Sequence, residues 1–170
     1  GIGVVWLDMN EFDMAEGYLS ESLQLGNRIG DAPGSGIACA GLGDLYLQTG
    51  RLPEARRFLE RGLALGKEQD DGIMQVHCQN TLAEVCVAEG RLGEAARLLD
   101  SGKAEAERIK AENLLGVYHR AAGILCAAKG DEPSARLNFD RSVEIHARLG
   151  EGFPLAKARA LNCGCWCPIS

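Results

Sequence analysis

The chain has 170 residues, of which 46% are hydrophobic and 25% charged, and its formal net charge is −6 at pH 7. This mildly acidic balance, without a cluster of basic residues, argues against a general nucleic-acid surface. Charge or glycine interrupts every apolar run before it reaches the length of a bilayer span, and no signal-peptide pattern opens the chain, so we expect no membrane contact and a cytoplasmic location.

The sequence repeats itself with a period of forty residues. The segments 10–15, 50–55, 90–95 and 130–135 superimpose when the chain is shifted by that length. A fixed period in this range is typical of a solenoid, in which each unit buries its apolar face on its neighbours. The period therefore predicts a continuous core and an extended surface.

Each repeat is predicted to be a pair of helices joined by a tight turn. Gly50, Gly90 and Gly130 each follow a run with helical apolar spacing, where a residue of positive φ is expected. Pro53 and Pro133 lie three residues further on, which suits the first turn of the next helix. The first helices are expected at about 37–49, 73–89, 114–129 and 153–166. The second helices end in polar connections at 30–36, 70–72, 111–113 and 150–152.

Apolar and small residues recur in columns along these helices. In the second helices, Ala55, Leu59 and Leu63 lie on one face, and the third copy has Lys103 in place of Leu63, so we expect the loosest packing there. A column of small residues predicts close helix contact. Its members are Ser22, Gly62, Gly102 and Ser142.

One motif recurs along the chain: a small residue, a bulky or apolar one three later, glycine at the turn, then alanine and a Leu or Phe four further on. Its most complete copy consists of Leu42, Gly43, Tyr46, Gly50, Ala55 and Leu59. The motif resembles the tetratricopeptide repeat, in a form whose period is forty residues instead of about thirty-four. The tryptophan of the family's first helix is replaced by Cys39, Gln79, His119 and Arg159.

The resemblance implies an all-α fold, a right-handed α-solenoid of antiparallel helix pairs, and a function in binding proteins. The long-period form is similar to helical regions of bacterial signal-transducing ATPases, large transcriptional regulators and nucleotide cyclases. We expect a single array over 1–170, with an incomplete repeat at 1–35, repeats at 36–72, 73–112 and 113–152, and the leading helix of a truncated repeat at 153–170. Since the chain starts at Gly1 within a repeat, we expect a fragment of a longer protein.

No arrangement of residues predicts catalysis or a cofactor. Seven cysteines, an odd number without framework spacing, indicate free thiols in a reducing compartment. Cys163, Cys165 and Cys167 leave open a soft-metal or redox site, although their spacing differs from that of zinc ligands and a frayed helix end is the alternative. None of the three histidines lies in a nucleophile motif. These histidines are His77, His119 and His146.

In the resembling family, one face of the first helices lines a concave groove, and the register assigns residues to it. The candidate groove residues are Asp44, Gln48, His77, Asn80, Glu84, Arg120, Ile124 and Lys157, with Ile37, Ala40, Leu47, Val87 and Val117 at the same register. Asn80, Arg120 and Lys157 are predicted to hold a carboxylate, and Asp44 and Glu84 to favour a cation. We therefore expect a peptide or protein partner. A small-molecule sensor and a scaffold that self-associates through its ends remain the alternatives.

Overall fold

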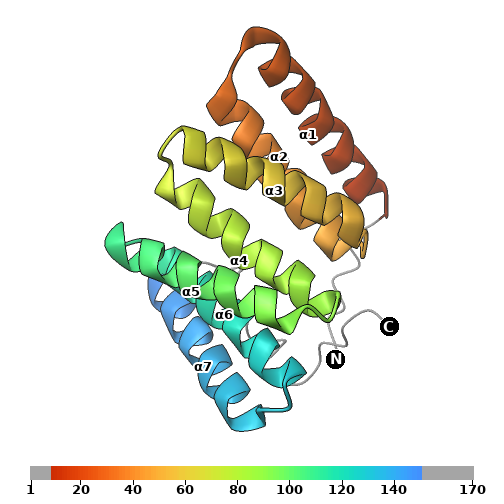
Figure 1. The fold of residues 1–170 in the computed structure, drawn as a ribbon. Helices are drawn as coiled ribbons and strands as arrows, with labels where there is room; N and C mark the ends of the chain where they lie inside the picture. Colours follow the sequence, from red (N-terminus) through yellow and green to blue (C-terminus); the bar gives the residue numbers. More distant parts are fainter. Residues whose placement is uncertain (1–8, 151–170) are drawn as a thin grey trace.

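The computed structural model describes residues 9–150, and this range consists of α-helices without a strand. Figure 1 shows the helices stacked one after another in chain order. Their bounds are α1 Met9–Ile29, α2 Ala32–Gln48, α3 Leu52–Glu68, α4 Gly72–Ala88, α5 Leu92–Arg108, α6 Glu112–Ala128 and α7 Glu132–Leu149. The predicted all-α solenoid is confirmed.

Helices and turns alternate with a period of twenty residues, half of the period seen in the sequence. The helices α2 to α6 have 17 residues each, and three-residue turns separate them. Every turn contains a residue in the left-handed region. The predicted positive φ of Gly50, Gly90 and Gly130 is confirmed, at 74°, 75° and 78°. Asp70 and Lys110 take the same conformation, with φ of 53° and 56°, in the turns between repeats.

The start of α2 differs from the prediction, which placed a connection at 30–36. Helix α2 begins at Ala32, because the Asp31 side chain accepts a hydrogen bond from the Gly34 amide at 3.0 Å and caps the helix. Pro33 fits the first turn, where its missing N–H leaves no intrahelical bond unmade. The expected helical starts around Pro53 and Pro133 are confirmed.

Consecutive helices pack in pairs, and each pair leans on the next. The helices α2 and α3, α4 and α5, and α6 and α7 form the pairs, while α4 also contacts both α2 and α6. Figure 1 shows α4 lying between α3 and α5. The core is accordingly a series of layers between helices, as the repeat predicts.

The small residue of the recurring motif lies against a large side chain of the next helix. A Cβ atom added to Gly43 would lie 2.4 Å from Leu59 Cγ, and one added to Gly123 would lie 2.4 Å from Phe139 Cε1. Leu59 is fully buried and Phe139 is 7% exposed. Glycine in the first helix thus makes room for the large side chain of the second.

The column of small residues is confirmed at Gly62, Gly102 and Ser142 and wrong at Ser22. A Cβ on Gly62 would lie 3.0 Å from Cys78 Sγ of α4, and the Ser142 hydroxyl donates to the Gly116 carbonyl at 2.8 Å. Ser22 is exposed because, within the described range, α1 packs on α2 alone. Close packing at this register requires helices on both sides.

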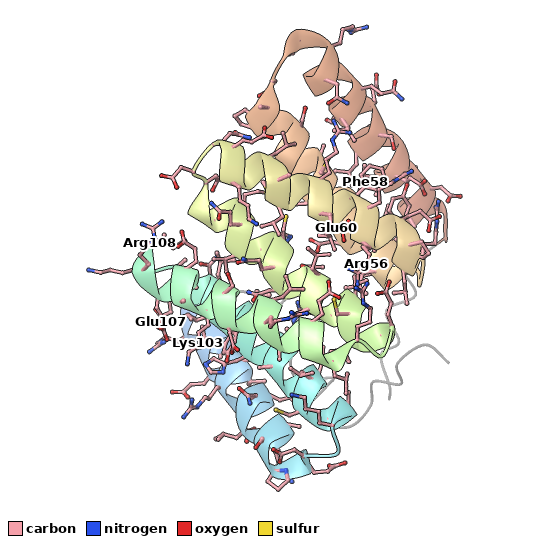
Figure 2. The ribbon with its side chains drawn as sticks, in the orientation of Figure 1. Arg56, Phe58, Glu60, Lys103, Glu107 and Arg108 are labelled. Carbon is pink, nitrogen blue, oxygen red and sulfur yellow. The ribbon has the colours of Figure 1, made fainter. Side chains whose placement is uncertain are left out.

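Lys103 and Arg56 show how charged side chains border the stacked helices. Lys103 is exposed, and its ammonium lies 5.8 Å from the centre of the Tyr118 ring in α6. Arg56 of α3 pairs with Glu60 at 3.2 Å, with Glu89 at 2.5 Å and with Glu94 of α5 at 3.2 Å. Figure 2 labels Arg56 and Glu60 in the space that separates α3 from α5 in this view. One half-buried guanidinium therefore joins three helices.

Candidate protein-interaction face

The polar residues predicted on the first helices form bonds from one helix to the next. Asp44 of α2 lies 3.0 Å from His77 Nε2 of α4 and accepts a hydrogen bond from the Thr81 hydroxyl at 3.1 Å. Burial lowers the pKa of His77. The hydrogen bond to Asp44 and the negative charge of Asp44 raise this pKa by more than burial lowers it, so the pKa of His77 lies above its usual value. The Asp44–His77 pair remains about one third exposed.

Glu84 and Arg120 form a second pair, between α4 and α6. The Arg120 guanidinium lies 2.7 Å from Glu84 Oε1, and the two side chains are only 10% and 5% exposed. Asn80 is fully buried and donates to the Leu114 carbonyl of α6 at 3.3 Å. These three side chains join neighbouring repeats inside the molecule and offer little surface to a ligand.

The remaining candidate groove residues within the described range do not take part in these bonds between helices. Ile124 is 7% exposed and packs with Ala135 and Phe139, so it belongs to the core. Gln48 is exposed near the end of α2. Lys157 lies outside the described residues, and so do Cys163, Cys165 and Cys167. The carboxylate-holding trio of Asn80, Arg120 and Lys157 therefore stays a prediction, because one of its members lies outside the described residues.

Two isoleucines complete the accessible part of this face. Ile37 of α2 is 64% exposed and Ile73 of α4 is 63% exposed. Ile37 lies two turns before Asp44, and Ile73 lies one turn before His77, so each isoleucine shares a helix face with one member of the pair. We call this surface the first-helix face, defined by Ile37, Asp44, Ile73 and His77.

Sequence reasoning missed Ile73. Its counterparts forty residues away are Pro33 and Asn113, so the repeat does not mark this column as apolar. The spacing of four residues to His77 is the signal that identifies it, because residues four apart lie on the same side of a helix.

A hollow of about 300 Å³ lies between α1 and α2, next to the first-helix face. Its walls are mostly apolar, and Asp44 and Gln48 bring polar groups to it. The lining residues are Phe12, Ala15, Leu19, Gly41, Asp44, Leu45 and Gln48. Two of the predicted groove residues thus border one hollow.

Comparison with known families agrees with this architecture. A family model described as tetratricopeptide repeat matches residues 1–68, and a second model with the same description matches residues 76–101, together more than half of the chain. The chain belongs to the tetratricopeptide repeat family. No curated protein matches it in a sequence search.

Tetratricopeptide repeats generally mediate protein–protein contact or scaffolding and are typically non-enzymatic. No group of His, Cys, Asp and Glu side chains suited to a metal ion occurs among the described residues. Among the described helices, no stretch combines the length and hydropathy that a bilayer crossing needs.

The other two histidines of this tetratricopeptide array lie in contacts between α6 and α7. His119 donates from Nδ1 to Asn138 Oδ1 of α7 at 2.9 Å, and burial lowers its pKa. This contact gives the half-buried His119 a structural role between α6 and α7. His146 is fully buried, and its ring lies 2.7 Å from the position of a Cβ added to Gly116.

Proposed function

We propose that the chain is a protein-interaction module that binds a peptide or protein segment on the first-helix face. The observation that carries the proposal is the pair of exposed isoleucines beside the Asp44–His77 pair, which is about one third exposed. Isolated exposed apolar residues are common, but here two adjacent helices each present one beside a shared polar pair. An apolar side chain of the partner would pack on Ile37 and Ile73, and a backbone or basic donor would bond to Asp44.

Selection of binders from a random peptide display library tests this proposal. The purified 170-residue chain is the bait, and the affinities of selected peptides are measured for Ile37→Asp combined with Ile73→Asp. We expect a loss of at least about tenfold, because two charges would border the apolar contact. Leu137→Asp on α7, which changes a residue 54% exposed, is the control and should bind as wild type. Selected peptides that bind the isoleucine variant unchanged would reject the first-helix face.

We also propose that this module works inside a larger signalling or regulatory protein in the cytoplasm. The support for the parent protein is the likeness of the forty-residue period to helical regions of bacterial regulators. The support for the location is that Cys39, Cys78, Cys86 and Cys126 are free thiols and the first three are buried. Free thiols persist in reducing compartments. Two measurements on the product of the complete coding region test these points. The domains that accompany the module test the proposed parent protein, and fractionation of the cell tests the proposed location.

Self-association is a second candidate function, favoured by the outer face of α1. Exposed apolar side chains recur along it at spacings of four and seven residues, which places them in one row. They are Met14, Tyr18, Leu25 and Ile29, exposed by 52%, 66%, 46% and 65%. We expect the mass measured by light scattering to rise with concentration if this row joins two copies. Tyr18→Glu combined with Leu25→Glu should then remove the rise, and a constant mass for wild type would reject this function.

A further inference from the structure

A second hollow lies on the other side of α4 from the first-helix face. The helices α3 and α5 both pack on α4 but their backbones do not pack on each other, so a groove of about 420 Å³ runs between them. Gln79 of α4 lines this groove, and it follows His77 by two residues. Residues two apart on a helix are separated by about 200°, so the groove and the first-helix face lie on opposite sides of α4.

The groove carries positive charge in a chain that is acidic as a whole. Its ionisable lining residues are Lys67, Arg91, Glu94 and Arg97. Glu94 is already paired with Arg91 at 2.6 Å and with Arg56 at 3.2 Å. Lys67 and Arg97, by contrast, have no acidic partner within residues 9–150. We call this surface the basic groove.

A hydroxyl and two leucines complete the basic groove. Gln79 is 7% exposed, and its amide donates to the Ser101 hydroxyl oxygen at 2.9 Å. The Ser101 oxygen therefore accepts from a fixed buried group, which leaves its hydrogen to be donated to a ligand. Leu63 and Leu98 are half-buried in the lining and offer apolar contact between the charges.

We propose that the basic groove binds an acidic segment of a protein partner. Carboxylates of that segment pair with Lys67 and Arg97, one of them accepts the Ser101 hydrogen bond, and an apolar side chain packs on Leu63 and Leu98. Charge complementarity commits the surface to an acidic partner, because the two cations are otherwise uncompensated. With a different partner on the first-helix face, the module would hold two proteins on opposite sides of one helix layer.

Fluorescence anisotropy of a labelled synthetic peptide of alternating glutamate and leucine tests the proposal. We expect binding that weakens with added salt, and a loss of at least about tenfold for Lys67→Glu combined with Arg97→Glu. Lys129→Glu combined with Arg136→Glu is the matched control, since it makes the same change of net charge at exposed positions outside the groove. The control should retain at least about half of the affinity. Equal losses in both variants, or no binding to wild type, would overturn the proposal.

Two further measurements separate this surface from its alternatives. Ser101→Ala should weaken binding by about threefold, and Lys67→Arg should retain it, because the arginine keeps the charge. Ile37→Asp combined with Ile73→Asp should leave the acidic peptide bound, so failure of the first-helix face would not imply failure of the basic groove. A single-stranded oligonucleotide that binds more tightly than the peptide, and is lost with the same groove variant, would overturn the assignment to a protein partner. Thermal melting of each variant establishes that it is folded.

Discussion

Gly43 shows how a single residue sets the distance between two helices. A Cβ at this position would meet Leu59 Cγ at 2.4 Å, and Leu59 is fully buried. We expect Gly43→Ala to lower the free energy of unfolding by about 1–3 kcal/mol, because α2 and α3 must separate or Leu59 must leave its rotamer. Urea denaturation monitored by circular dichroism measures the change.

The control for this substitution is Gly17→Ala. Gly17 lies within α1, and an added Cβ has no neighbour within 4 Å. The alanine should raise the free energy of unfolding by about 0.5–1 kcal/mol through helix propensity alone. If the two substitutions change the free energy of unfolding in the same direction, the packing assigned to Gly43 is incorrect.

His77 and His119 should give the protein opposite responses to pH. The folded pKa of His77 is raised, so its stabilising contribution is complete below the unfolded pKa and is lost as pH rises through the folded value. The folded pKa of His119 is lowered by burial, so its contribution is present above the unfolded pKa and is lost as pH falls through the folded value. The groups facing His77 are Asp44, Arg120 and Glu84.

Denaturation of two variants at two pH values separates these contributions. We expect the loss of stability in His77→Gln to be larger at about pH 5.5 than at about pH 8.5. For His119→Gln, the order of the two values should be reversed. A pH-independent loss in His77→Gln would contradict the ion pair with Asp44.

At the scale of the helices, we expect Arg56 to contribute more to the free energy of unfolding than any exposed ion pair does. Its side chain is 16% exposed and bonds to Glu60, Glu89 and Glu94. Arg56→Met leaves Glu89 and Glu94 with only the largely exposed Arg91 as a cationic partner, and we expect a loss of about 1–3 kcal/mol in the free energy of unfolding. Arg108→Met removes a pair with Glu105 in which the arginine is 63% exposed, and should cost less than about 1 kcal/mol. Figure 2 labels both arginines.

A double-mutant cycle checks that the effect of Arg56 comes from the carboxylates. Glu89→Gln and Arg56→Met are made singly and together, and the coupling free energy is obtained from their unfolding midpoints. A coupling near zero would mean that Arg56 acts by packing of its aliphatic stem instead.

The predictable elements are those in which one residue determines the local backbone. Gly50 ends α2 because it adopts positive φ, and Pro53 begins α3, so the turn follows from these two residues. The sequence pattern predicts the start of α2 five residues late, because the glycines at 34 and 36 indicate a loop, whereas the Asp31 cap outweighs their low helix propensity.

The pairs across the first helices could not be predicted. Asp44 and His77, and Glu84 and Arg120, lie on neighbouring helices whose separation depends on side chains elsewhere, such as Gly62 against Cys78. The register places these residues on one side of their helices but not within bonding distance. Burial of Glu84 and Arg120 therefore emerges only from the packed structure.

At the scale of the whole molecule, stability depends on contacts between neighbouring repeats, because no repeat has a core of its own. The Glu84–Arg120 pair is the nearly buried ionic link between α4 and α6. Glu84→Gln leaves the Arg120 charge without its carboxylate, and we expect a loss of about 3–5 kcal/mol. The loss should be local, so that amides of α6 and α7 exchange with solvent faster while those of α2 and α3 change little.

A charge-free pair distinguishes lost pairing from lost packing. Glu84→Met combined with Arg120→Met removes both charges while keeping most of the volume, and should recover the larger part of the stability. Arg148→Ala removes an exposed pair with Glu112 and should cost less than about 1 kcal/mol. A double variant as unstable as Glu84→Gln, or faster exchange spread evenly over all helices, would contradict a stability built from neighbouring repeats. Recovery in the double variant, with exchange restored in α6 and α7, would show that this pair couples the last two described repeats.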